Sequence, residues 1–495
     1  MAEEIVISVT PHESRVAVIA QGLLQEIFIE RFHKRGTVGN IYQGKVVRIL
    51  PGLQSAFVSI GQEKAAFMHI TDLIDSHELV SDERSEKFEY PPILDVLHDG
   101  EELLIQVSKE PIGSKGARIT SHISLASRYL VYLPGSNHVG ISQRIEDDAE
   151  RQRLTDLLES IKLGGKKAGF IVRTASEGVS GEDIRKDAEL LQARWATIVK
   201  DAATSKAETL VYEDLPLPLR VMRDIINPET DRILVDNMSI YSTLQRFLED
   251  FIPDKLGCLE IASGDVALFD AHNLEDQIEA ALDRKVPLKS GGYLIVDQTE
   301  AMTTVDVNTG AFVGRRDLEE TVYRTNLEAA AAIPRQLRLR NIGGIVIIDF
   351  IDMMDEEHKR QVLRTLEKGQ QLDRVRWNIT EISDLGLVEM TRKRTHESLL
   401  KMMCAPCEVC NGRGFTKTAE TVALEIFREI QRKARDLRKG CLIMASQSVI
   451  DRLLDEDSAC VDELATALGA TIQLRVETSY SQEQFDVIIT SSSNR

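Results

Sequence analysis

Two short runs of apolar and polar residues give the clearest structural signal in the chain. Residues 303–308 alternate between polar and valine positions, which places the valines on one face of a strand and Asp306 and Asn308 on the other. Residues 345–348 are all β-branched, and this run ends at Asp349. Both runs are therefore predicted to be strands, and each presents a carboxylate near the end of its strand.

The acids at these strand ends need a chemical explanation, because an unpaired carboxylate is costly to bury. Asp306 and Asp349 imply either compensating cations or a hard divalent ion held by carboxylate oxygens. A lone aspartate after a strand more often caps a helix or turn, and Asp352, which precedes residues 353–357, is interpreted as such a cap. Asp306 and Asp349 remain the candidates for a magnesium site.

A run of short strands is predicted within residues 39–124, with turn signals such as Pro51-Gly52 between them. The predicted strands cover residues 39–49, 55–60, 65–69 and 102–107. This pattern is typical of a small antiparallel barrel, most simply an OB-fold. Phe57 and Phe67, with Lys109 and Lys115 nearby, could form a platform on which single-stranded bases stack. The alternative is that both phenylalanines belong to the core.

Helical periodicity dominates several other segments. The predicted helices cover residues 142–160, 181–206, 318–340 and 428–439. Between the first two lies a predicted strand, residues 169–174, that presents Arg173 and Thr174 at its end. An arginine in this position can bind a phosphate, but it more commonly pairs with an acid of its own domain, here Glu177 or Asp183.

Composition narrows the class of protein. A chain of 495 residues should hold roughly three or four domains. A hydrophobic content of 43% and a charged content of 28% are ordinary for a soluble globular protein. The net charge of −19 argues against coating by nucleic acid but permits a local basic groove. No apolar run is long enough to span a membrane, and the acidic first residues do not resemble a signal peptide, so a cytoplasmic protein is expected.

Half of the six cysteines lie close together in the sequence. Cys404, Cys407 and Cys410 form two overlapping C-x-x-C pairs followed by a glycine turn, a pattern typical of zinc binding. Two pairs that share a cysteine supply three thiolates, whereas tetrahedral zinc takes four ligands. A second chain could supply the missing ligation.

Three segments together resemble the ribonuclease E/G family: residues 291–302 before Asp306, residues 335–344 before Asp349, and the cysteine cluster. The resemblance runs from end to end. It implies an α+β multidomain fold in which an RNase H-like subdomain is interrupted by an OB-fold and by a 5′-end sensor domain. The implied domains are RNase H-like 1–38 and 215–278, OB-fold 39–124, 5′-sensor 125–214, DNase I-like catalytic 279–400, zinc link 401–414 and a small C-terminal αβ domain 415–495.

The same resemblance implies a magnesium-dependent endoribonuclease that is specific for single strands and stimulated by a 5′-monophosphate. It would cut AU-rich RNA to leave 5′-phosphate and 3′-hydroxyl ends, with roles in ribosomal RNA 5′-end maturation and messenger RNA turnover. The residues implied are Asp306 and Asp349 for magnesium, Asn308 as their support, Arg173, Thr174 and Arg374 for the 5′-phosphate, Phe57, Phe67 and Lys115 for RNA, and Cys407 and Cys410 for zinc. A zinc ion shared between chains would give a homodimer or homotetramer, with Cys404 as the spare thiol.

Two alternatives stay open at this stage. The chain could be the catalytic half of a longer member of the family, one that carries a disordered scaffold arm. It could also be a non-catalytic RNA-binding protein built on the OB-fold, with structural acids. The intact set of Asp306, Asn308 and Asp349 argues against the second, because a degenerate relative would be expected to have lost at least one of them.

Overall fold

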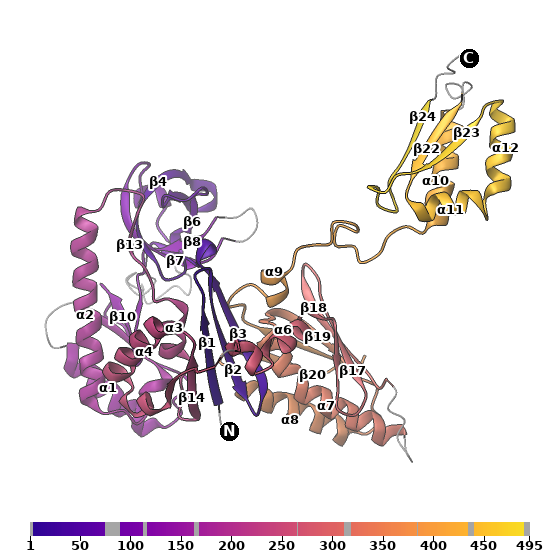
Figure 1. Cartoon of the computed structure of the whole chain (residues 1–495). Coiled ribbons are helices and arrows are strands. Elements are labelled where there is room, and N and C mark those ends of the chain that lie inside the picture. Colours follow the sequence, from indigo (N-terminus) through magenta and orange to yellow (C-terminus); the bar gives the residue numbers. More distant parts are fainter. Residues whose placement is uncertain are drawn as a thin grey trace. The chain divides into compact units, whose positions relative to one another are not determined.

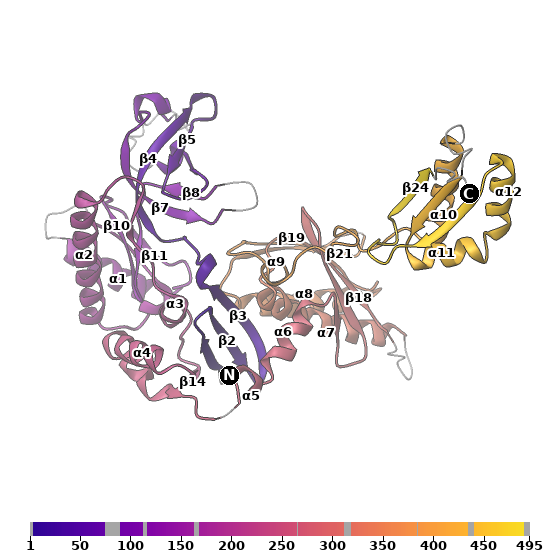
Figure 2. The same cartoon turned by 45° about the horizontal axis from the view of Figure 1, so that its top comes forward.

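The structure is a computed structural model that describes residues 3–74, 90–111, 116–162, 168–264, 266–310, 318–383, 385–433 and 440–489. Its chain forms two compact units, Met1–Leu400 and Lys401–Arg495. Both units mix helices and strands, so the expected α+β class is confirmed. Figures 1 and 2 show the elements of each unit from two directions.

The first sheet of the larger unit is built from two distant segments of the chain. Its order is β15-β14-β1-β2-β3, with β14 parallel to β1 and β15, and β1 to β3 antiparallel. The strands are β1 (Glu3–Val9), β2 (Glu13–Ala20), β3 (Leu23–Arg31), β14 (Thr230–Val235) and β15 (Leu259–Ile261). Residues of α3 (Leu217–Asp224) and α4 (Met238–Phe251) pack on one face, and residues of α5 (Leu268–Ala271) and α6 (Leu274–Leu282) on the other.

The predicted barrel is confirmed as a closed, OB-like barrel. Its strands follow the order β4-β5-β6-β8-β7, and β7 pairs back with β4. The strands are β4 (Ile41–Leu50), β5 (Ser55–Ser59), β6 (Ala66–His69), β7 (Glu102–Lys109) and β8 (Arg118–Thr120). A later strand, β13 (Thr209–Tyr212), extends the barrel sheet by pairing with β4. The apolar residues that alternate along these strands fill the interior.

A four-stranded sheet of order β11-β12-β10-β9 follows, packed against two helices. Its elements are β9 (Leu125–Ala126), β10 (Leu130–Pro134), β11 (Val139–Ile141), β12 (Ala168–Val172), α1 (Asp148–Lys162) and α2 (Gly181–Thr204). Two boundaries differ from the prediction. The first helix begins at Asp148 instead of residue 142, because the chain turns after β11, where the Ile145 N–H donates to the Ser142 carbonyl oxygen over 3.2 Å. Thr174 begins a 3-10 turn and lies beyond the strand, which ends at Val172.

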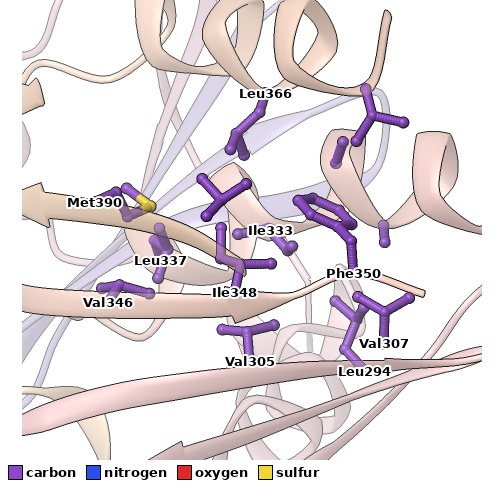
Figure 3. Close-up of a cluster of buried hydrophobic side chains, with 14 of the residues drawn as sticks. Leu294, Val305, Val307, Ile333, Leu337, Val346, Ile348, Phe350, Leu366 and Met390 are labelled. Carbon is purple, nitrogen blue, oxygen red and sulfur yellow. The ribbon is translucent and has the colours of Figure 1, made fainter. Parts of the chain in front are cut away.

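The acid-bearing strands belong to a six-stranded sheet of order β16-β17-β18-β19-β21-β20. Its strands are β16 (Lys285–Pro287), β17 (Tyr293–Gln298), β18 (Met302–Asn308), β19 (Gly344–Asp349), β20 (Trp377–Ile382) and β21 (Leu387–Arg392). Helices α7 (Leu318–Leu339) and α8 (Glu356–Gln371) cover one face, where Val305, Val307 and Ile348 meet Ile333, Leu337 and Leu366 (Figure 3). The other face carries the polar positions of β18, so the predicted alternation is confirmed.

Two local features of this layer concern the helices. The cap of α8 is Asp355, whose side chain accepts a hydrogen bond from the Glu357 N–H, so the interpretation of Asp352 as the cap is wrong. The helical pattern begins three residues later than expected. Helix α7 continues through Pro334, whose ring lies against Gly369 of α8. A Cβ built on Gly369 would be 2.3 Å from Pro334 Cγ, so the close approach of these helices requires glycine there.

The smaller unit contains a three-stranded sheet of order β23-β22-β24. Its elements are α10 (Ala419–Arg432), β22 (Cys441–Ala445), α11 (Gln447–Leu454), α12 (Ser458–Leu468), β23 (Ile472–Val476) and β24 (Phe485–Ile489). A short helix, α9 (Leu399–Met403), lies at the boundary with the larger unit. Helix α10 contains the start of the predicted helix 428–439, and residues 434–439 lie outside the described residues.

Candidate functional site

Asp306 and Asp349 lie directly opposite each other in the register of the parallel strands β18 and β19. Both are exposed, on the sheet face that α7 and α8 leave uncovered. The Asn308 side chain donates a hydrogen bond from Nδ2 to Asp306 Oδ2 over 2.8 Å. Because Asn308 is two residues from Asp306, it shares that face and holds one carboxylate oxygen in place.

The two carboxylates repel each other. Burial raises the pKa of Asp349, and the negative charges of Asp306 and Asp352 raise it further. Such a pair is stabilised by a cation, and carboxylate oxygens are the ligands that a hard divalent ion prefers. Within the described residues, no group of three or more His, Cys, Asp or Glu side chains is arranged to hold a metal. Asp306 and Asp349 can supply two carboxylate ligands to an ion that keeps water or substrate oxygens as its other ligands.

Three arginines gather at the C-terminal end of α3. Arg173 pairs with Asp224 through Nη2 at 2.5 Å, and its Nη1 donates to the Ser127 carbonyl oxygen at 2.6 Å. Arg374 donates to the carbonyl oxygen of Ile225 over 3.2 Å. Arg128 donates to the carbonyl oxygens of Arg223 and Ile226 over 3.0 and 2.8 Å. The C-terminal end of a helix carries partial negative charge, which favours cations there.

Arg128 was not predicted from the sequence, and no local pattern distinguishes it. Burial lowers the pKa of its guanidinium, and the nearby charges of Arg173 and Arg374 contribute to the lowering. Its Nε is buried without a hydrogen-bond partner among the described residues. The acid that pairs with Arg173 is Asp224, which belongs to a segment distant in the sequence, so the alternative of a pairing with Glu177 or Asp183 is wrong. Three guanidiniums in one place form a site suited to an anion with several oxygens.

The other predicted members of this site lie at its edges. Thr174 is exposed next to Arg173, and its hydroxyl is 3.1 Å from that of Ser142. Arg374 is 34% exposed, and the carboxylates of Glu3 and Glu26 are each 3.9 Å from its guanidinium. Burial raises the pKa of Glu26, an effect that the charge of Arg374 opposes. The contacts of the Arg374 guanidinium with acidic side chains are therefore long, and these long contacts are the acidic ones with which a phosphate would compete.

Arg374 follows a buried ion pair that fixes its place. The Asp373 carboxylate accepts hydrogen bonds from Arg392 Nε and Trp377 Nε1, both over 2.8 Å. Both charged side chains of this pair are almost fully buried, at 4% and 2% exposure. The carbonyl oxygen of Asp373 also accepts a 2.9 Å hydrogen bond from Arg144, a residue of the segment between β11 and α1. The Arg144 hydrogen bond therefore connects the segment before β20 to the segment before α1.

The barrel presents an aromatic and basic row on its outer surface. Phe57 and Phe67 are cross-strand partners with ring centroids 6.1 Å apart and an interplanar angle of 68°. Both are half-buried and lie outside the barrel core, so the alternative that they are core residues is wrong. Arg48 is the register partner of Phe57, and Arg118 that of Phe67. Sequence reasoning missed both arginines because strand register is not visible locally.

The sequence also predicts two lysines, Lys109 and Lys115, near the aromatic pair of the barrel. Lys109 is exposed and pairs in register with Arg118, which extends the row by one strand. Lys115 lies outside the described residues. The Arg118 guanidinium is held by Asp72, with Nε and Nη2 donating over 3.0 and 3.1 Å. The row therefore has a fixed cation beside its aromatic rings.

The cysteine cluster lies in the smaller unit. Cys404 and Cys407 are exposed and Cys410 is half-buried. The backbone N–H of Gly414 lowers the pKa of the Cys410 thiol, and contacts with Gly412, Cys407 and Arg413 lower it further. N–H groups directed at a sulfur favour the thiolate, which is the form that binds a metal. Cys407 and Cys410 are thus close together, in a setting that suits a soft cation.

Comparison with known proteins identifies the class. The model of the ribonuclease E/G family matches residues 124–395, and the model of the RNase E/G thioredoxin-like domain matches residues 406–490. The chain belongs to the ribonuclease E/G family, and the expectation of an endoribonuclease is confirmed. The smaller unit contains the thioredoxin-like domain of that family. No helix among the described residues is long and apolar enough to cross a membrane.

Individual relatives show which members of the family the chain is similar to. The chain is 48% identical over 491 residues to Ribonuclease G of Salmonella typhimurium (strain SL1344), which covers 99% of this chain and 100% of the relative. It is 45% identical over 492 residues to Ribonuclease G of Haemophilus influenzae, with 99% of each chain covered. Identity to Ribonuclease E of Escherichia coli (strain K12) is 35% over 457 residues, which is 92% of this chain and 43% of the relative.

Proposed function

We propose that the chain is a magnesium-dependent endoribonuclease specific for single-stranded RNA, with Asp306 and Asp349 as the metal ligands. The observation that carries this proposal is the direct opposition of the two exposed carboxylates across β18 and β19. The Asn308 hydrogen bond supports it, because that bond holds one carboxylate oxygen and leaves the other free to ligate. Membership of a ribonuclease family supports RNA as the substrate.

Each residue has a defined role in this mechanism. A bound magnesium ion would supply an activated water and stabilise the negative charge that develops on the phosphodiester. Asp306 and Asp349 would bind the ion through oxygen, and Asn308 would orient Asp306. Attack in line with the 3′-oxygen leaving group yields 5′-phosphate and 3′-hydroxyl ends. By similarity to the family, the substrates are AU-rich messenger RNA and a ribosomal RNA precursor.

Cleavage of a single-stranded RNA by Asp306→Asn and Asp349→Asn variants tests the site. Each substitution keeps the shape of the side chain but removes an anionic ligand, so turnover should fall to the level measured without magnesium while RNA binding survives. Asp231→Asn is the matched control, because Asp231 is an exposed strand aspartate of the first sheet. Near-normal cleavage by either test variant would overturn the assignment.

We further propose that Arg128, Arg173, Thr174 and Arg374 bind the 5′-monophosphate of the substrate. A terminal monophosphate carries between one and two charges near neutral pH and three acceptor oxygens, which matches convergent guanidiniums. In the free protein, carbonyl oxygens at the end of α3 and the Asp224 carboxylate hold these arginines. A phosphate must compete with these contacts, whereas a 5′-hydroxyl lacks the charge to do so.

This second site predicts a preference that can be measured. RNA with a 5′-monophosphate should be cut faster than the same RNA with a 5′-hydroxyl. Arg173→Ala and Arg374→Ala should abolish the difference and leave cleavage of the hydroxyl form nearly unchanged. Arg232→Ala is the control, since Arg232 forms an exposed ion pair with Glu260 on the first sheet. A preference that survives in both test variants would place the phosphate site elsewhere.

The remaining regions take supporting roles in the proposal. Phe57, Phe67 and Lys115 would hold single-stranded RNA on the barrel, with Arg48 and Arg118 as additional cations. Cys407 and Cys410 would share one zinc ion with the same pair of a second chain, giving a homodimer or homotetramer, with Cys404 uninvolved.

We also assign the expected subdomains to the observed layers. The first sheet and its helices would be the RNase H-like subdomain, made of residues 1–38 and 215–278. The four-stranded sheet of residues 125–214 would be the 5′-sensor domain. The six-stranded sheet of residues 279–400 would be the DNase I-like catalytic subdomain, followed by the zinc link at 401–414. The unbroken sheet formed by β1 to β3 with β14 and β15 supports the interrupted arrangement.

A further inference from the structure

The uncovered face of the catalytic sheet continues past the carboxylate pair toward its β16 edge. Ile295 is the register partner of Asp306, and Tyr293 that of Asn308. Lys285 of β16 is in turn the partner of Ile295. Register partners project from the same face, so Lys285 and Tyr293 share the face that carries Asp306 and Asn308. Neighbouring strands are about 5 Å apart, which puts the Lys285 backbone roughly 10 Å from that of Asp306.

Lys285 and Tyr293 form a cation–π pair at this edge. The Lys285 ammonium lies 4.0 Å from the centroid of the Tyr293 ring. Lys285 is exposed and Tyr293 half-buried, so part of each side chain is open to a ligand. Gly310 lies beside the ring, because a Cβ built on this glycine would be 3.3 Å from Tyr293 Cδ1. The ring therefore lies at the end of β18, on the sheet face that carries the carboxylates.

The charge on Lys285 has no acidic partner among the described residues, unlike that on its neighbour Arg284, which pairs with Asp297. The alternative role of a lysine on an edge strand is to prevent pairing with another sheet. Here, however, the ammonium and the ring lie on the same face as two carboxylates that would repel a phosphate backbone. A cation and an aromatic surface at that position match the two parts of a nucleotide, which are an anionic phosphate and a flat base.

We propose that Tyr293 and Lys285 form a nucleotide-binding subsite next to the scissile phosphate of single-stranded RNA. Tyr293 stacks on one base, and Lys285 neutralises a neighbouring backbone phosphate. Both are positioning residues. The inference rests on the proposed function, because it takes Asp306 and Asp349 as the place of cleavage. RNA is the expected occupant because the subsite is continuous with the carboxylate pair and because the charge of Lys285 is complementary to that of a phosphate.

The test for Tyr293 uses a short RNA with a single cleavage site and a series of copies in which one base near that site is removed. In wild type, one abasic position should reduce kcat/KM by about 5- to 150-fold, the usual range for loss of one stacked base. Tyr293→Ala should cut the intact RNA more slowly by a similar factor and show no further loss at that position. Tyr293→Phe keeps the ring and should retain both the rate and the abasic effect.

The test for Lys285 is RNA binding measured without magnesium as a function of salt. Removal of one phosphate contact should reduce the slope of log Kd against log salt by about 0.7 in Lys285→Ala. Lys200→Ala, which removes an exposed lysine of α2, is the control and should keep the wild-type slope. Thermal melting of each variant checks that the fold is intact.

The two proposals fail in different ways. Equal abasic penalties in Tyr293→Ala and wild type at every position, or an unchanged slope in Lys285→Ala, would overturn the subsite. If Asp306→Asn and Asp349→Asn cleave normally while the salt slope still changes in Lys285→Ala, then the catalytic assignment is wrong but Lys285 contacts RNA. If the test results for both residues are as expected, the uncovered sheet face is the path of the substrate.

Discussion

The buried pair formed by Asp373 and Arg392 connects the stability of the six-stranded sheet layer to the position of Arg374. Asp373 Oδ2 accepts from Arg392 Nε and Trp377 Nε1, and Oδ1 accepts from the Val375 N–H and Arg392 Nη2 over 2.9 and 3.3 Å. In Asp373→Asn, an amide N–H₂ replaces one of the two carboxylate oxygens. Because each oxygen accepts from two donors, the N–H₂ would point at two donors in either orientation of the amide. It would also leave the Arg392 charge buried without its counter-ion.

The expected cost is large. Breaking a buried ion pair by removing one partner costs about 3–5 kcal/mol, which lowers the folding equilibrium constant roughly a hundred- to a few-thousand-fold. Much of that cost comes from the charge left behind, so Asp373→Asn combined with Arg392→Gln should lose clearly less than the sum of the two single variants. Because Arg374 is the next residue, Asp373→Asn should also reduce the preference for 5′-monophosphorylated RNA.

The assay is urea unfolding followed by tryptophan fluorescence. The chain has two tryptophans, and Trp377 donates directly to Asp373, so a Trp195→Phe background reports on this layer alone. Cleavage of matched 5′-phosphate and 5′-hydroxyl RNAs below the transition gives the functional result. If Asp373→Asn unfolds within about 1 kcal/mol of the background protein, the cost derived from the buried pair is wrong. A normal 5′ preference in a destabilised variant would show that Arg374 is positioned by other contacts.

Three other substitutions test separate features. Gly369→Ala should destabilise the larger unit by about 1–3 kcal/mol, measured by thermal melting, because the new methyl group would overlap Pro334; an unchanged melting temperature would show that the helices separate freely. Asn308→Ala should lower kcat/KM about 10- to 100-fold and increase the magnesium requirement, and a wild-type magnesium titration would exclude a supporting role. Replacing Cys407 and Cys410 by serine should release zinc and reduce the oligomer mass measured by light scattering, whereas unchanged metal content and mass would refute the shared site.

The sequence by itself determined those features that depend on local periodicity. Alternation in residues 303–308 predicted which side chains of β18 are buried and which carry chemistry, because side chains of a strand project to opposite faces in turn. The same reasoning located the barrel strands β4, β5, β6 and β7, but not the short strand β8. It misplaced the cap of α8, because Asp352 and Asp355 are both suitable residues, and only the start of the hydrogen-bonded helix distinguishes them.

Only the tertiary structure decided which distant residues meet. Arg128, Arg173 and Arg374 come from separate segments and converge on the end of α3 because the layers of the larger unit pack there. The opposition of Asp306 and Asp349, and the placement of Lys285 and Tyr293 on the same sheet face, depend on strand order and register. A shift of one residue would turn these side chains to the other face, and the register is set by burial of the valines and isoleucines across the whole sheet, which no short segment encodes.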